Sequence, residues 1–160
     1  MSTVVPRLGS KAPEFIARNQ HGEDVRLSEF RDRRNVVLVF YPYAFSGVCT
    51  NELAELRDHL PVFTAAGAEV LAISCDPMFS LRAFSDAQRL GFSLLSDFWP
   101  HGAIASAYGV FDADRGCAVR GTFMIDRTGV LRWSVVNPMG DARDLDDYKK
   151  ALAGLEEPLG

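Results

Sequence analysis

The stretch "NVVLVFYPYAFSGVCTNE", residues 35–52, decides the fold prediction because two hydrophobic patterns meet in it. Residues 35–42 form an apolar, β-branched run without polar alternation, which predicts a strand buried on both faces. From Cys49 onward, leucines recur at three- and four-residue spacing, which predicts one face of a helix. A cysteine therefore stands near the start of a helix that follows a buried strand. It is either a thiolate stabilised by the helix N-terminus or a small buried hydrophobe.

The rest of the chain alternates between strand-like and helix-like segments. The helix that begins near Cys49 contains Pro61, so we expect it to break close to His59. The order of segments predicts an α/β fold, a mixed central sheet with helices on both faces, in a single domain of residues 1–160. Further strands are expected at residues 14–18, 24–27, 69–75, 92–97 and on both sides of the turn 126–129, and further helices at 79–90, 101–109 and 144–155.

Composition narrows the function classes. The 160 residues are 48% hydrophobic and 24% charged, as in ordinary globular proteins, and the net charge of −4 includes no basic block. Nucleic acid and anionic membranes are therefore poor candidates for partners. No apolar run reaches the length of a membrane span, and the start has no hydrophobic signal region, so a cytoplasmic location is expected.

The cysteines do not predict a disulfide framework or a metal site. There are three, Cys49, Cys75 and Cys117, which is an odd number without a C-x-x-C pair. The three histidines have no metal-ligand spacing to them. We therefore expect no bound metal.

Several short motifs resemble the peroxiredoxin family. Pro42, Ser46 and Cys49 match the pattern Pro-x-x-x-Thr/Ser-x-x-Cys, and Glu52 matches the acidic residue that commonly follows that cysteine. "RGTFMID" resembles the segment that supplies an active-site arginine, here Arg120. "LGSKAPEF", "LRDHLPVF" and "LLSDFWPHGAIASAYGVF" extend the resemblance, and the last two are similar to the alkyl hydroperoxide reductase E (AhpE) branch.

The resemblance implies a thioredoxin-like fold and a role for each matched residue. Cys49 would be the peroxidatic cysteine, and Ser46, in place of the more usual threonine, would bind a peroxide oxygen through its hydroxyl. Arg120 would stabilise the thiolate and the transition state. Pro42 would shield the thiolate from water, and Glu52 would orient Arg120.

Thiolate formation alone does not explain a fast peroxidase. For a cysteine thiol in general, lowering the pKa from about 8.5 to about 6 raises the thiolate fraction at pH 7.4 about 13-fold. The less basic thiolate is a weaker nucleophile, and a Brønsted slope of about 0.45 removes about the same factor. Acceleration must therefore come from donors to the departing oxygen. The donors available are Arg120, the Ser46 hydroxyl and the Cys49 backbone N–H.

The other two cysteines leave alternatives open. Cys75 ends a predicted strand, which favours core packing, but strand ends share the active-site edge, so it is also a candidate resolving cysteine. Cys117 lies three residues before Arg120, and in an extended segment this spacing puts the two on opposite faces. Ala54 occupies the position of a second cysteine five residues after Cys49. We therefore prefer a one-cysteine mechanism, in which an external thiol reduces a sulfenic acid.

The sequence thus predicts a thiol peroxidase that reduces hydrogen peroxide, organic hydroperoxides or peroxynitrite through a Cys49 sulfenic acid. The AhpE resemblance implies mycothiol or mycoredoxin as the reductant and a homodimer; no metal, haem or flavin cofactor is implied. The alternatives are a two-cysteine enzyme resolving through Cys75, a peroxide-sensing interaction protein, and a scaffold without redox chemistry. The apolar residues Tyr43 and Phe45 are expected to contact an alkyl substrate or a partner subunit.

Overall fold

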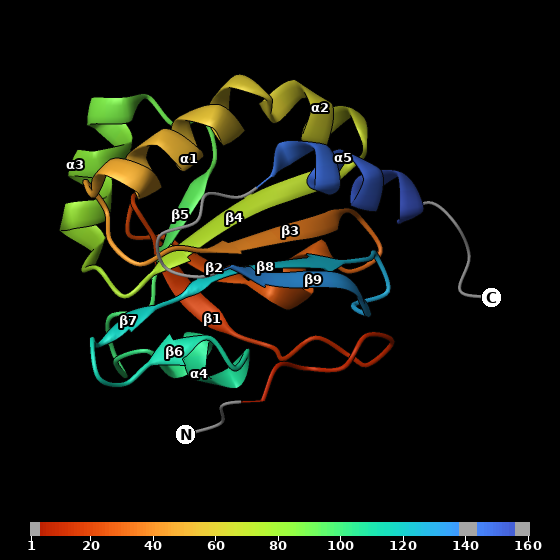
Figure 1. Ribbon diagram of the computed structural model, residues 1–160, viewed down its shortest axis with the longest axis horizontal. Coiled ribbons are helices and arrows are strands. Elements are labelled where there is room, and N and C mark those ends of the chain that lie inside the picture. Colours follow the sequence, from red (N-terminus) through yellow and green to blue (C-terminus); the bar gives the residue numbers. More distant parts are fainter. Residues whose placement is uncertain (1–3, 138–143, 156–160) are drawn as a thin grey trace.

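The computed structural model describes residues 4–137 and 144–155, which build a seven-stranded sheet with helices on both faces (Figure 1). The strand order is β2-β1-β5-β4-β3-β8-β9, with a separate two-stranded ribbon β6-β7. The strands are β1 (Ile16–Asn19), β2 (Asp24–Arg26), β3 (Asn35–Phe40), β4 (Ala68–Ser74), β5 (Ser93–Ser96), β6 (Phe111–Asp112), β7 (Cys117–Ala118), β8 (Arg120–Ile125) and β9 (Leu131–Asn137). The helices are η1 (Leu27–Phe30), α1 (Gly47–Asp58), α2 (Leu60–Ala65), α3 (Met78–Gln88), α4 (Ala103–Ala107) and α5 (Leu145–Gly154).

The sheet is mixed, as predicted, and its parallel part defines one functional edge. Strands β3, β4 and β5 run parallel, while β8 lies antiparallel beside β3. The carboxyl ends of the three parallel strands therefore meet at the edge where β8 begins. This register brings the segments after Phe40, Ser74 and Ser96 to the same edge of the sheet as Arg120, with the segment after Phe40 next to it. In open α/β sheets, this is the edge where sites form.

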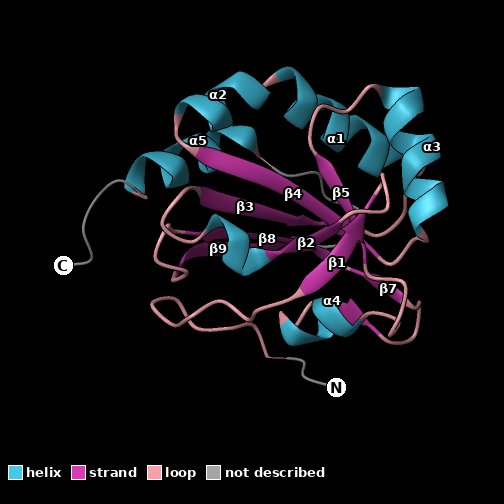
Figure 2. Ribbon diagram, turned by 180° about the vertical axis from the view of Figure 1, so that it is seen from behind, coloured by secondary structure: helices cyan, strands magenta, loops and turns pink. Residues whose placement is uncertain are grey.

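Strand β3 is buried on both faces, which confirms the prediction from its apolar run. All six of its residues are buried. Val37 and Val39 face a core packed by α1, α2, α3 and α5, whereas Leu38 and Phe40 face a second core that includes residues of α4. Figure 2 shows these four helices along one side of the sheet and α4 on the other. Alternate side chains of β3 thus pack into the two cores on opposite faces of the sheet.

Most predicted elements are present, with shifted ends. The helix expected from Cys49 begins two residues earlier, at Gly47, and the predicted break occurs at His59, between α1 and α2. The strand expected at 24–27 is shorter, because Leu27 begins the 3₁₀ helix η1. The ribbon β6-β7 was not predicted, since two-residue strands are too short to show alternation. None of the described helices has the length and hydropathy needed to span a membrane.

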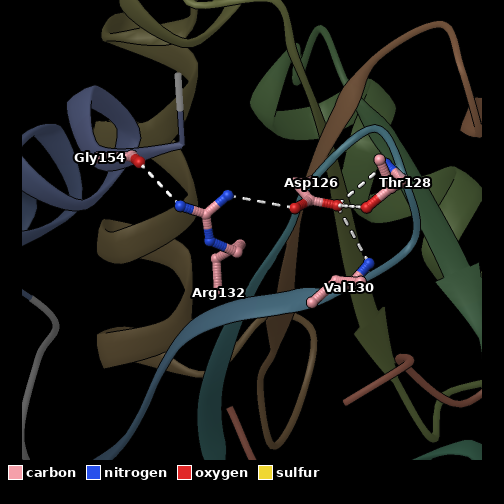
Figure 3. Close-up of polar contacts among 5 residues, drawn as sticks. All are labelled: Asp126, Thr128, Val130, Arg132 and Gly154. Carbon is pink, nitrogen blue, oxygen red and sulfur yellow. Dashed lines mark hydrogen bonds and ion pairs between the residues drawn. The ribbon is translucent and has the colours of Figure 1, made fainter. Parts of the chain in front are cut away.

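The turn between β8 and β9 is fixed by a carboxylate network (Figure 3). Asp126 Oδ1 accepts hydrogen bonds from the Thr128 N–H (2.9 Å), the Thr128 hydroxyl (2.6 Å) and the Val130 N–H (3.1 Å). Arg132 Nη1 donates to Asp126 Oδ2 (3.2 Å), and its Nη2 donates to the Gly154 carbonyl (3.3 Å), which ties the end of α5 to the sheet. Burial alone would raise the pKa of Asp126, but these hydrogen bonds outweigh it and hold the pKa below its ordinary value.

Arg132→Met should therefore destabilise the protein by about 1–2 kcal/mol at pH 7, through the loss of charge-assisted hydrogen bonds. Because the folded-state pKa of Asp126 is lowered, its contribution is present above the unfolded pKa of about 3.9 and is lost as pH falls through the folded value. The difference between wild type and variant should therefore shrink at pH 2.5, measured by urea unfolding. Arg18→Met, which removes a mostly exposed partner of Asp24, is the control and should cost less than about 1 kcal/mol. A difference that is the same at both pH values would contradict this role for Asp126.

Candidate active site

Cys49 lies in the first turn of α1, where the sequence predicts it. Ser46 is the N-cap residue, and its carbonyl accepts the Thr50 N–H at 2.8 Å. N–H groups in a first turn have no partner within the helix, and the helix dipole is positive there, so this position favours an anion. The Cys49 side chain has 0% exposure and packs in the core cluster that also contains Tyr41 and Leu53.

The Arg120 guanidinium joins the cysteine to a carboxylate. Arg120 Nη2 donates to Cys49 Sγ at 3.3 Å, and Nη1 forms an ion pair with the Glu52 carboxylate. Both charged side chains are almost fully buried, at 2% exposure for Arg120 and 5% for Glu52. Glu52 follows Cys49 by three residues, so the two side chains lie on one face of α1. The helix therefore presents the Cys49 sulfur and the Glu52 carboxylate to one guanidinium from β8.

The loop that leads from β3 into α1 is held at several points. Ser46 Oγ donates to the Tyr43 carbonyl (3.0 Å), and the Tyr43 hydroxyl donates to the Arg115 carbonyl (3.3 Å). Phe45 has a positive φ of 69°, and its ring packs against Phe84 with centroids 5.0 Å apart. The Ser46 hydroxyl thus has a fixed rotamer despite lacking the threonine methyl.

An open pocket of about 250 Å³ lies over this helix start. Arg120 is the charged residue of its lining, and Pro42 is buried beneath it. The lining consists of Pro42, Tyr43, Ser46, Gly47, Val48 and Arg120. A molecule in this pocket meets the guanidinium that contacts Cys49, although the sulfur itself has no exposed surface.

Cys75 and Cys117 are buried free thiols at the same edge of the sheet. Burial, followed by the charge of Asp97, raises the pKa of Cys75 to about 12. Burial also raises the pKa of Cys117, in spite of a hydrogen bond with the Tyr43 hydroxyl. Thiols with raised pKa values contain little thiolate at neutral pH and react slowly.

The alternation expected between Cys117 and Arg120 does not apply, because the chain is not continuously extended there. Cys117 belongs to the ribbon β6-β7, whereas Arg120 begins β8. The Gly121 N–H donates to the Val119 carbonyl at 3.0 Å, which marks a tight turn centred on Arg120. A Cβ added at Gly121 would lie 2.9 Å from Val110 Cγ1, so a larger residue there would require the Val110 side chain to move or to be smaller.

Asp76 contributes to the site although the sequence reading did not single it out. Its Oδ2 accepts the Ala44 N–H at 2.8 Å, so it contacts the loop that precedes Cys49. Asp76 follows the predicted strand that ends at Cys75, and this position at a carboxyl end was a usable signal. Within residues 4–137 and 144–155, no three His, Cys, Asp or Glu side chains are grouped to hold a metal ion.

Comparisons with known proteins identify the family of the chain. The AhpC/TSA family model matches residues 8–134. Alkyl hydroperoxide reductase E of Mycobacterium tuberculosis is 45% identical over 148 residues, which cover 92% of this chain and 97% of that protein. The chloroplastic 2-Cys peroxiredoxin BAS1 of Hordeum vulgare is 33% identical, with 95% of this chain and 76% of that protein covered.

Solved structures show the same architecture. The reduced 2-Cys peroxiredoxin of Plasmodium vivax superposes with a TM-score of 0.87 at 26% identity, covering 94% of this chain and 83% of that one. Peroxidoxin BcpB of Mycobacterium tuberculosis gives a TM-score of 0.80 at 30% identity, covering 93% of this chain and 96% of that one. The fold is thus the thioredoxin-like fold of peroxiredoxins, as expected.

A buried cysteine at a helix start, paired with an arginine on this fold, defines a thiol peroxidase. The chain belongs to the AhpC/TSA family of peroxiredoxins, and within that family it is AhpE-like.

Glu52→Ala should destabilise the protein by about 3 kcal/mol, because it leaves the Arg120 guanidinium buried without its carboxylate. Urea unfolding of the reduced protein at pH 7 measures the change. Glu55→Ala removes an exposed carboxylate from the same helix and is the matched control, with an expected effect below about 0.5 kcal/mol. Equal stabilities of the two variants would show that the buried ion pair has no structural role.

Proposed function

We propose that this protein reduces hydrogen peroxide and organic hydroperoxides, with peroxynitrite as a further substrate, by a one-cysteine mechanism centred on Cys49. The observation that carries the proposal is the contact of Arg120 Nη2 with Cys49 Sγ at 3.3 Å, in the first turn of α1. One cation thus faces both the nucleophile and the pocket through which a peroxide approaches.

In the first step, the Cys49 thiolate attacks one peroxide oxygen. An S–O bond forms as the O–O bond breaks, and the departing oxygen takes up a proton and leaves as an alcohol or water. Sulfur loses two electrons and becomes a sulfenic acid, while the peroxide is reduced. Arg120 and the Cys49 N–H stabilise the charge that develops on the departing oxygen, together with the Ser46 hydroxyl once its proton turns from the Tyr43 carbonyl to that oxygen. Glu52 orients Arg120, and Pro42 keeps water from the sulfur.

In the second step, an external thiol attacks the Cys49 sulfenic acid, which releases water and gives a mixed disulfide. A second thiol then releases Cys49 and leaves as the reductant's disulfide. The raised pKa values of Cys75 and Cys117 support this route over internal resolution. The two-cysteine route through Cys75 and a purely peroxide-sensing role are the alternatives that the experiments below address.

The reductant and the assembly are further parts of the proposal. The AhpE-like sequence supports mycothiol or mycoredoxin as the reductant, and a homodimer. A patch of exposed aromatic side chains, Phe79 (73% exposed), Phe98 (46%) and Trp99 (83%), supports a subunit contact because single chains rarely leave such side chains uncovered. The three free thiols support a cytoplasmic location, and residues 1–160 are proposed to act as one domain.

Arg120→Ala should lower the second-order rate constant for peroxide by about 100- to 1000-fold, since it removes the main donor to the departing oxygen. A change in thiolate fraction should explain little of this loss, because thiolate content and nucleophilicity have opposite effects on the rate that largely offset each other. Stopped-flow rates measured alongside a thiol titration separate the two effects. A loss of rate that merely parallels the loss of thiolate would contradict transition-state stabilisation by Arg120.

The one-cysteine mechanism predicts a trapped sulfenic acid on Cys49 after one equivalent of peroxide, detected by mass spectrometry with a dimedone probe. Cys75→Ser and Cys117→Ser should retain steady-state turnover with a small-thiol reductant, whereas Cys49→Ser should lose it. A Cys49–Cys75 disulfide would establish the two-cysteine route instead. Stoichiometric oxidation without turnover by any thiol of a broad panel would favour the sensor.

A further inference from the structure

We infer that Asp76 is a positioning residue of the active site, whose carboxylate fixes the loop of residues 42–46 and so positions the Ser46 hydroxyl and Pro42 at the pocket. This inference rests on the proposed peroxidase function, but its structural part can be tested independently. Asp76 touches neither Cys49 nor the pocket lining, so it acts through the loop backbone.

The contacts of Asp76 form a chain from the sheet to the loop. Its Oδ2 accepts the Ala44 N–H at 2.8 Å and the Ser74 hydroxyl at 2.7 Å. The Ser96 hydroxyl donates to the Asp76 carbonyl at 2.7 Å, which fixes the backbone of Asp76 to the end of β5. Contacts with Ser74 of β4 and Ser96 of β5 therefore fix the orientation in which the Asp76 carboxylate faces the loop.

The loop needs this anchor because its next residue is in an unfavourable conformation. Phe45 follows Ala44 and has a φ of 69°, a region that costs a residue other than glycine about 1–3 kcal/mol. Such strain persists only where the surroundings hold the backbone. The contact of the Phe45 ring with Phe84 fixes the side chain, and the Asp76 carboxylate fixes the preceding N–H.

Loss of the hydrogen bond between Asp76 and the Ala44 N–H should displace the pocket residues of the loop more than the Cys49 sulfur. Pro42 and Ser46 lie on either side of Ala44 in the loop and line the pocket. Cys49 is held separately, because α1 packs through Leu53 and Leu56 in the core. A relaxed loop should therefore misalign the Ser46 hydroxyl and Pro42 while leaving the Cys49 sulfur in place.

Asp76→Ala should lower kcat/KM for hydrogen peroxide by about 10- to 100-fold, the usual scale for a small misplacement of catalytic groups. Alkylation of Cys49 by iodoacetamide, which uses no donor to oxygen, should stay the same or become faster. Asp76→Asn should remain within about 3-fold of wild type, since its amide oxygen can still accept both hydrogen bonds. Asp86→Ala removes an exposed carboxylate from α3 and is the control.

Hydrogen exchange at the Ala44 amide gives a readout independent of catalysis. Exchange should accelerate in Asp76→Ala and stay slow in Asp76→Asn, with the amides of α1 unchanged. If Asp76→Ala does not fold, Ser74→Ala removes the donor that orients the carboxylate and should show the same pattern at smaller amplitude. An inactive wild type with normal exchange effects would reject the peroxidase proposal but keep the loop anchor.

Three results would overturn the inference: unchanged peroxide kinetics in Asp76→Ala, a parallel fall in alkylation and peroxide rates, or an Asp76→Asn variant as impaired as Asp76→Ala. The first would show that the loop does not depend on the carboxylate. The second would point to general disruption of the site, and the third to a requirement for charge rather than for hydrogen-bond geometry.

Discussion

The buried guanidinium of Arg120 is the constraint on which the rest of the site depends. A charge removed from water is stable only when it is closely paired, and here the partners are Glu52 and the Cys49 sulfur, three residues apart on α1. The sulfur is fully buried in an apolar cluster, a placement that by itself would describe an inert cysteine. The contact with Arg120 is what separates it from Cys75 and Cys117.

The sheet brings Arg120 to Cys49 and Glu52 through regular strands. Because β3, β4 and β5 end at one edge and β8 begins there, the helix start, the Asp76 carboxylate and Arg120 arrive from three separate strands. Each is fixed by strand register rather than by a flexible connection. The loop of residues 42–46 departs from regular geometry, and it carries Phe45 with its φ of 69°.

The sequence predicted the elements that depend on long patterns. The buried strand β3, the helix start before Cys49 and the break at His59 follow from apolar periodicity and one proline. Short pieces were missed, because two-residue strands such as β6 and β7 carry no periodicity. Cys49, Arg120 and Glu52 were identified by motif and then found together in space. Asp76 was missed because residue types do not show that its carboxylate accepts the Ala44 N–H, and its place after a predicted strand was the signal available.

The glycine after Arg120 brings strand β8 close to Val110. Val110, from the core on the α4 side, occupies the space that a side chain at position 121 would need. A larger residue at 121 is therefore tolerable only alongside a smaller one at 110. Homologous chains should drift at these two sites in a correlated manner, and a survey of natural variants could reveal that covariation without any enzymology.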